Sequence, residues 1–156
     1  MSAYITSEGY ELRHLIENVT WDSLNGDTVV DLGGAHGDAA VAIAAANPSL
    51  NLIVQDLLPV IESRPKLAEG LEDRIVFMAH DFLTEQPVKN AAVYIFRWIF
   101  HNWSDEFCLR ILRNLIPALK PKAKVIINDA CLPEPNTLGL LAERQIRYAI
   151  SPLSLR

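Results

Sequence analysis

The sequence has little cysteine, and this scarcity excludes two kinds of small protein. Only Cys108 and Cys131 occur among 156 residues, so the disulfide framework that stabilises small secreted domains is not available. Neither cysteine belongs to a CxxC or CxxH motif, the spacing typical of zinc sites. We therefore predict two reduced thiols that serve as packing residues, and no bound metal.

Positive charge and long apolar runs are also scarce. The sequence carries 14 Lys and Arg against 19 Asp and Glu, a formal net charge of -5, which disfavours nucleic acid and anionic membranes as partners. No apolar run reaches the ~20 residues that span a bilayer, and the first residues lack the basic start and apolar stretch of a secretion signal. We expect a cytoplasmic protein that binds neither nucleic acid nor membrane.

Apolar residues, by contrast, make up half of the sequence, in segments that alternate between strand and helix patterns. Continuous apolar runs predict strands at 28–32, 51–56, 74–79, 92–99 and 124–132. Helical spacing predicts helices at 7–20, 38–48, around 59–69, 105–120 and from about 136 to 150. Such alternation gives one open α/β domain with a parallel sheet and helices on both faces.

The stretch "VVDLGGAHGD" (29–38) places a glycine-rich turn between the first strand and the following helix. In open α/β sheets, ligands bind beyond the carboxyl ends of the strands, where this turn is expected. Gly33, Gly34 and Gly37 remove Cβ atoms where the chain turns and where a ligand can approach the backbone. Ala35 replaces the second glycine of the dinucleotide fingerprint GxGxxG, which disfavours a diphosphate.

Two carboxylates accompany this turn. Asp31 stands just before it and suits a ligand with an amino group or a positive charge. Asp56, at the end of the second strand, can accept hydrogen bonds from both hydroxyls of a ribose. The pair favours a cationic nucleoside as ligand. From the turn alone, the alternative of a structural strand-to-helix connection without a ligand stays open.

Two further stretches, "AHDF" (79–82) and "FRWIFHNWSD" (96–105), make the sequence resemble the plant and fungal S-adenosylmethionine-dependent O-methyltransferases over nearly the whole chain. The resemblance implies a Rossmann-like class I methyltransferase fold and S-adenosyl-L-methionine as cofactor. Full-length members of that family also have an N-terminal dimerisation domain and two further strands. We expect both to be absent here, which leaves a partial cofactor-binding domain over 1–156.

The resemblance also assigns cofactor-binding residues by their positions in the family motifs. These are Asp31, Gly33, Gly34, Gly37, Asp56, Leu57, Asp81, Phe82, Arg97 and Trp103. Asp56 inherits the contact with the ribose, whereas Asp81, Phe82 and Trp103 inherit contacts with the adenine. Taken singly, Phe82 and Trp103 fit ordinary core packing better, so these roles depend on the combined motif.

The catalytic residues implied by the resemblance are His101 and Asp129. His101 matches the family's general base, and an imidazole suits the removal of a phenol or enol proton. Asp129 aligns with a glutamate that brackets this base, and its shorter side chain raises the question whether it reaches the histidine directly or through water. Asn102 replaces an aspartate of the usual His-Asp-Trp. The expected reaction is methyl transfer to a hydroxyl of a small aromatic or polyketide-type metabolite.

Several other functions stay open from the sequence. The chain could be a truncated, noncatalytic remnant or a partner subunit that keeps cofactor binding or pairs through its open sheet edge, with a second copy or another protein supplying the missing elements. It could also catalyse a dehydration or a pericyclic step on the same scaffold. Ala35 argues against a nicotinamide dehydrogenase. A Mg²⁺-dependent methyltransferase would need Asp81, Asp105 and Asp129 to converge, which nothing in the sequence requires.

Overall fold

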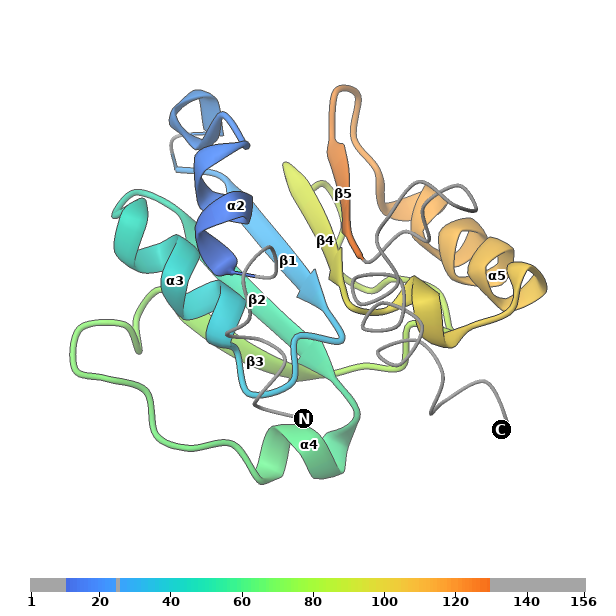
Figure 1. The fold of residues 1–156 in the computed structure, drawn as a ribbon, viewed down its shortest axis with the longest axis horizontal. Helices are drawn as coiled ribbons and strands as arrows, with labels where there is room; N and C mark the ends of the chain where they lie inside the picture. The colour runs from blue at the N-terminus through green and yellow to red at the C-terminus, as the bar shows by residue number, and fades with distance from the viewer. Residues whose placement is uncertain (1–10, 25, 130–156) are drawn as a thin grey trace, which may run out of the picture.

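A computed structural model describes residues 11–24 and 26–129, which form a five-stranded parallel sheet (Figure 1). The strands are β1 (Thr28–Leu32), β2 (Asn51–Asp56), β3 (Ile75–Ala79), β4 (Val93–Arg97) and β5 (Lys124–Asn128). Their order across the sheet is β3-β2-β1-β4-β5, so the strand order reverses between β1 and β4. Ligands bind at such a reversal, beyond the carboxyl ends of the strands. The predicted parallel α/β sheet is confirmed.

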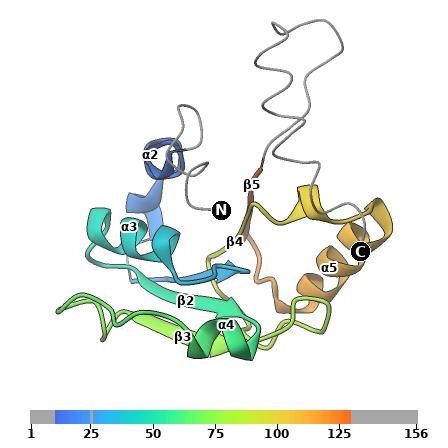
Figure 2. The same cartoon turned by 60° about the horizontal axis from the view of Figure 1, so that its bottom comes forward.

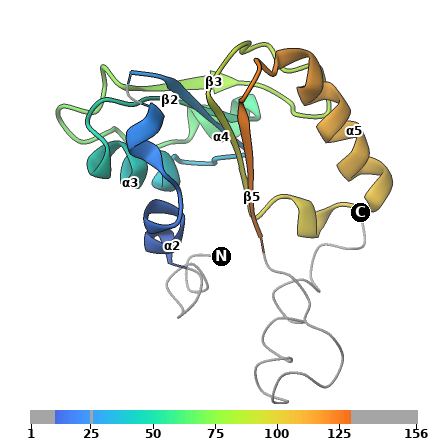
Figure 3. The ribbon, with the colours of Figure 1, turned by 90° about the horizontal axis from the view of Figure 1, so that it is seen from above.

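Helices cover both faces of this sheet. α2 (Leu12–Glu17) and α3 (Asp38–Ala46) lie on one face, and α5 (Asp105–Leu115) lies on the other (Figure 3). The short α4 (Leu58–Glu62) directly follows β2. The described residues also contain three 3₁₀ turns: η1 (Trp21–Leu24), η2 (Phe100–Asn102) and η3 (Ile116–Ala118).

The strand alternation divides the core into two clusters. In β1, Val29 belongs to the cluster under α2 and α3, whereas Val30 belongs to the cluster under α5. Successive side chains of a strand point to opposite faces, which explains this division. Because both faces of β1 and β4 are buried, their sequences read as continuous apolar runs, the feature from which they were predicted.

Prolines shorten two of the predicted helices. The helix expected around 59–69 ends at Glu62, since Pro65 disfavours helical geometry in the residue before it. The helix expected over 105–120 is α-helical to Leu115 and then continues as η3, which contains Pro117.

The fourth strand is also shorter than the predicted 92–99. It ends at Arg97 because Trp98 adopts a left-handed φ of 59°, a conformation that cannot continue a strand. The predictions for residues 7–10, for the helix at 136–150 and for Cys131 lie outside the described residues. Within the part that the structure describes, no helix is long and apolar enough to cross a membrane.

A pair of buried glutamines holds the connection between β3 and β4 (80–92) against the sheet. This connection runs past α4 toward α5 (Figure 2). Gln55 Nε2 donates to Gln86 Oε1 at 2.9 Å, and Gln86 Nε2 donates to Gln55 Oε1 at 2.8 Å. Gln86 Oε1 also accepts the Val88 N–H at 2.9 Å. The amides satisfy each other inside the protein, so the connection is held against β2 without a helix of its own.

Candidate functional site

The backbone amides of the glycine turn after β1 are hydrogen-bonded to the end of β2, at the carboxyl edge of the sheet. The Gly33 and Gly34 amides donate to the Gln55 carbonyl oxygen at 2.7 and 3.1 Å. The Ala35 amide donates to Asp56 Oδ2 at 2.9 Å. A phosphate-binding loop needs such amides free to point at its ligand. The turn therefore fits a diphosphate poorly, in agreement with the alanine in its sequence.

Neighbouring side chains leave no space for a Cβ atom at two of the turn's glycines. A Cβ on Gly33 would stand 2.4 Å from Ile99 Cδ1, and a Cβ on Gly34 would stand 2.5 Å from Asp31 Oδ2. Gly33 also has a left-handed φ of 71°, which glycine adopts without strain. Packing and backbone geometry thus require these glycines. The glycines alone therefore do not indicate a ligand, whereas the side chains around them do.

Asp31 is the most unusual of those side chains. It is only 1% exposed, and its Oδ2 atom has no hydrogen-bond partner among the described residues. Burial raises the pKa of its carboxyl group to about 7; the positive charge of Arg97 opposes this shift and the negative charge of Asp56 adds to it. An isolated buried carboxylate is costly, so a site for positive charge next to it would offset that cost.

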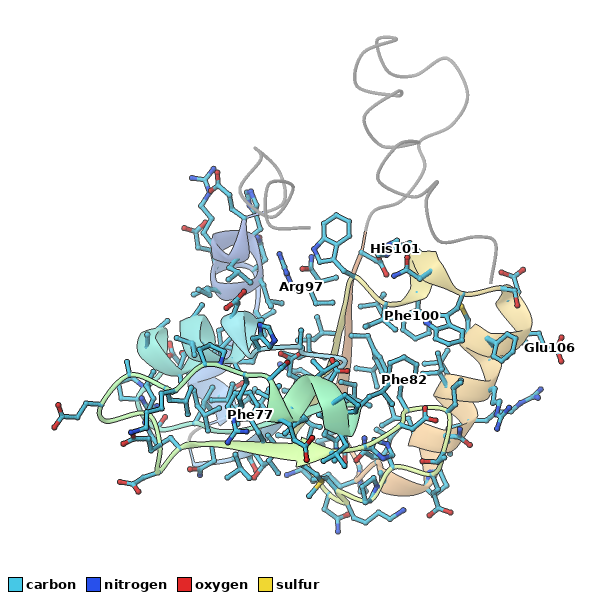
Figure 4. The ribbon with its side chains drawn as sticks, turned by 90° about the horizontal axis from the view of Figure 1, so that it is seen from below. Phe77, Phe82, Arg97, Phe100, His101 and Glu106 are labelled. Carbon is cyan, nitrogen blue, oxygen red and sulfur yellow. The ribbon has the colours of Figure 1, made fainter. Side chains whose placement is uncertain are left out.

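Arg97 ends β4 on the α3 side of the sheet (Figure 4). Burial lowers the pKa of its guanidinium group, while the negative charges of Asp31 and Asp38 oppose that shift. The guanidinium carbon also lies 6.0 Å from the centre of the Trp98 ring. The Arg97 guanidinium group therefore lies near the carboxyl groups of the turn and also near Trp98, the residue that follows β4.

Asp56 presents a fixed carboxylate at the end of β2. Its Oδ2 accepts the Ala35 amide and its Oδ1 accepts the Leu57 amide at 2.8 Å. Each carboxylate oxygen can accept a further hydrogen bond, so Asp56 can receive two hydroxyl groups. The Leu57 side chain is exposed beside it.

The acidic residue that follows β3 is arranged differently. Asp81 is exposed, and its Oδ1 accepts the Leu83 amide of its own loop at 2.8 Å. The Asp56 carbonyl, however, accepts the His80 amide at 2.9 Å, so the two strand ends are adjacent. Asp81 thus stands at the same edge as Asp56, with one carboxylate oxygen directed into its own loop.

Aromatic side chains border the turn on both faces of the sheet. Phe77 would contact a Cβ on Gly37 at 2.9 Å. On the α5 side, where Figure 4 shows Phe82 and Phe100, the Phe82 and Trp103 rings meet edge to face with centres 5.7 Å apart. Flat aromatic surfaces of this kind can hold a nucleobase. The sequence indicated Phe82 and Trp103 but gave no separate signal for Phe77.

His101 and Asp129 form a second group, at the ends of β4 and β5. His101 Nδ1 lies 2.5 Å from Asp129 Oδ1, and the His101 backbone amide donates to Asp129 Oδ2 at 3.2 Å. Their side chains are only 9% and 8% exposed. The aspartate therefore reaches the histidine directly, without a bridging water. It holds both the ring and the backbone of His101.

A strained residue that the sequence did not single out supports this pair. Trp98 has its left-handed φ and packs edge to face on the His101 ring, with centres 5.4 Å apart. Its amide donates to the Asn128 carbonyl at 3.0 Å, and its carbonyl accepts Asn102 Nδ2 at 3.2 Å. Bulky residues adopt this conformation only when their surroundings enforce it, and such strain gathers at functional sites.

The predicted site residues thus fall into two neighbouring groups along one edge of the sheet. Around the turn lie the glycines, Asp31, Asp56, Leu57, Phe82 and Arg97, with Trp103 joined through Phe82. His101 and Asp129 form the separate pair. In residues 11–24 and 26–129, no three His, Cys, Asp or Glu side chains are arranged to hold a metal ion.

Comparison with known proteins places the chain in a family. The model of the O-methyltransferase domain matches residues 7–146. The chain is 50% identical to the grayanic acid biosynthesis cluster O-methyltransferase of Cladonia grayi, with 94% of this chain and 33% of that protein covered. It is 42% identical to the chlorophenol O-methyltransferase of Trichoderma longibrachiatum, with 94% and 32% covered. The chain spans about a third of the length of these curated relatives.

Solved structures share the fold. The mitomycin 7-O-methyltransferase matches with a TM-score of 0.79 and 26% identity, over 92% of this chain and 41% of that one. A pericyclic reaction enzyme matches with a TM-score of 0.69 and 28% identity, over 94% and 39%. The predicted class I methyltransferase fold is therefore confirmed for the described residues. By sequence and by fold, the chain belongs to the O-methyltransferase domain family.

Proposed function

We propose that this protein transfers a methyl group from S-adenosyl-L-methionine to a hydroxyl group of a small aromatic or polyketide-type metabolite, with His101 as general base. The observation that carries the proposal is the direct 2.5 Å contact between His101 Nδ1 and Asp129 Oδ1, beside a turn that suits a cationic nucleoside. The names of the relatives support the same reaction.

The residues around the turn fit S-adenosyl-L-methionine. Asp31 supplies a buried carboxylate oxygen without a partner among the described residues, which suits the positive charge of this cofactor. Asp56 is held so that it can accept the two ribose hydroxyls. Phe82 and Trp103 offer aromatic surface for the adenine. The internally bonded amides of the turn suit a ligand without phosphate.

The chemistry follows from the way His101 is held. When bound, the cofactor supplies an electrophilic methyl group on a sulfonium. A carboxylate that accepts a hydrogen bond from Nδ1–H leaves Nε2 as the free proton acceptor. His101 Nε2 can then take the proton of the acceptor hydroxyl, which leaves the oxygen as the nucleophile toward the methyl group that the cofactor would supply. Asp129 stabilises the imidazolium that results, and buffer later removes its proton.

We further propose that the protein works in the cytoplasm, in secondary metabolism. The thiol of Cys108 is free, which suits a reducing compartment, and one relative belongs to a biosynthesis cluster.

The test is methyl transfer from radiolabelled S-adenosyl-L-methionine to a panel of phenols that includes chlorophenols. We expect His101→Ala to lower the rate at least ~10²-fold, as loss of a general base does, with unchanged binding of S-adenosylhomocysteine. His14→Ala, in α2, serves as the matched control and should keep the full rate. A His101→Ala protein with wild-type activity would remove the assigned base.

A second candidate function is a dehydration or pericyclic step, with the bound cofactor acting as a fixed positive charge. The match to a pericyclic reaction enzyme at 28% identity favours keeping this candidate. The two functions differ in the fate of the cofactor. Conversion of an acceptor without formation of S-adenosylhomocysteine would support the second function, whereas equimolar formation would support methyl transfer.

A further inference from the structure

Asp31 occupies a position where the fold alone calls for an apolar side chain. It lies in the middle of the sheet, opposite Val54 of β2 and Ile95 of β4, and both neighbours are fully buried. A carboxyl group there must lose its hydration, and its Oδ2 gains no hydrogen bond from the described residues in return. We therefore expect Asp31 to stabilise a bound ligand and not the free protein.

The charges that face Asp31 leave an excess of negative charge. Arg97, from β4, contributes the positive charge, and Asp56, from β2, contributes a further negative charge. Asp38, at the start of α3, acts in turn on Arg97. Among the described residues, this set of interacting charges thus contains three carboxyl groups and one guanidinium group. A ligand cation would correct this imbalance, and a proton on Asp31 corrects part of it in the free protein.

We propose that Asp31 exchanges its own proton for the positive charge of the ligand, so that the site selects a cationic nucleoside and releases a proton on binding it. The inference deepens the proposed function and rests on it. The proton passes from the Asp31 carboxyl group to buffer, and no bond other than this O–H bond is broken. Neutral nucleosides gain nothing from the exchange and bind more weakly.

The exchange makes affinity depend on pH in a defined direction. The pKa of Asp31 in the free protein is about 7, and a nearby cation lowers it. Below neutral pH, binding must therefore first remove the proton. If the bound form stays ionised throughout, the affinity rises about tenfold from pH 6 to pH 8 and then levels off.

Titration calorimetry of the full chain with S-adenosylhomocysteine, in phosphate and in Tris at pH 7, measures the number of protons released. S-adenosylhomocysteine carries a positively charged ammonium group beside its carboxylate, whereas 5′-methylthioadenosine carries no positively charged group. We expect roughly half a proton released with the former and none with the latter. Asp31→Asn should abolish the release, and Asp22→Asn, on the exposed surface of η1, should keep it.

A wild-type protein that binds S-adenosylhomocysteine with the same heat in both buffers would overturn the exchange and leave the proposed function standing. Absence of any binding would overturn both. Because Asp31→Asn can perturb folding, NMR of wild-type protein with ¹³C-labelled aspartate carboxyl groups gives an independent test. One carboxyl signal should titrate near neutral pH in the free protein and lose that titration in the complex; a signal unaffected by the ligand would also overturn the inference.

Discussion

At the scale of single residues, Asp129 determines which nitrogen of His101 is free to take a proton. Its carboxylate contacts Nδ1 and also accepts the backbone amide of His101, so ring and main chain are fixed together. The resemblance to known methyltransferases pointed to a longer glutamate here. The end of β5 compensates for the shorter side chain, because it lies directly beside the end of β4.

Asp129→Asn tests this orientation. The amide can donate to Nδ1, which favours the tautomer with the proton on Nε2 and removes the base. By analogy with triads in which the orienting aspartate is replaced, we expect methyl transfer to fall roughly 10²- to 10⁴-fold. Binding of S-adenosylhomocysteine, measured by calorimetry, should not change. Asp129→Glu keeps a carboxylate and should recover part of the rate; equal activity of all three proteins would contradict the assigned role.

Asp31→Asn should change how stability depends on pH. The folded state raises the pKa of Asp31 from 3.8 to about 7, so it retains a proton that the unfolded chain gives up. Wild-type stability is therefore lost as pH rises toward 7. The free energy of unfolding should fall on the order of 2–3 kcal/mol more in wild type than in the variant between pH 5 and pH 8. Urea unfolding at both pH values measures this difference, and parallel curves would argue against it.

At the scale of elements, the connection from β1 to α3 requires glycine for two different reasons: a left-handed backbone at one position and lack of space for a Cβ atom at another. At Gly33 the backbone is left-handed, whereas at Gly34 the demand is space alone, because Asp31 Oδ2 and Val54 Cγ1 would lie 2.5 and 2.9 Å from an added Cβ. Gly26 has a left-handed φ of 77° but open space around it. These positions allow the two demands to be separated.

Gly34→Ala should destabilise the fold by overpacking, typically ~1–3 kcal/mol, and should weaken binding of S-adenosylhomocysteine because it displaces Asp31. Gly26→Ala is the matched control. It adds backbone strain on the order of 1 kcal/mol and should leave binding unchanged. Urea unfolding and calorimetry on both variants check this. Similar losses of affinity in the two variants would mean that binding weakens because the fold is destabilised, and not because the space at Gly34 is filled.

The elements differ in how far the sequence alone could predict them. The five strands were predictable because each contains a run of apolar residues, although only β1 and β4 are buried on both faces. The end of β4 was not, since the left-handed Trp98 is held by Asn128, a residue thirty positions further along, and by Asn102. Local propensity carries no information about such a contact. The meeting of His101 and Asp129 was expected from family motifs, but its directness depends on the register of β4 with β5.

At the scale of the whole molecule, β5 forms one edge of the sheet described here and pairs with β4. On its α5-facing side, Val125 is 38% and Ile127 is 52% exposed. An edge strand with exposed apolar residues invites pairing with another chain. If copies of the chain associate, we propose that they do so through this surface.

Ile127→Lys should reduce that association, since an edge lysine opposes strand pairing. Sedimentation velocity at increasing protein concentration measures the shift toward monomer. Leu109→Lys, at a position in α5 that is 51% exposed, is the matched control and should associate like wild type. If Ile127→Lys associates as strongly as wild type, the contact between copies lies elsewhere.

The internally bonded glycine turn has a kinetic consequence. Because the Gly33, Gly34 and Ala35 amides are bonded within the protein itself, the turn is already built before any ligand arrives. In hydrogen exchange these amides should be protected in the free protein, and the ligand should add little protection. Binding then has no loop to order, so it loses no entropy in doing so and the rate of association is set by diffusion and charge.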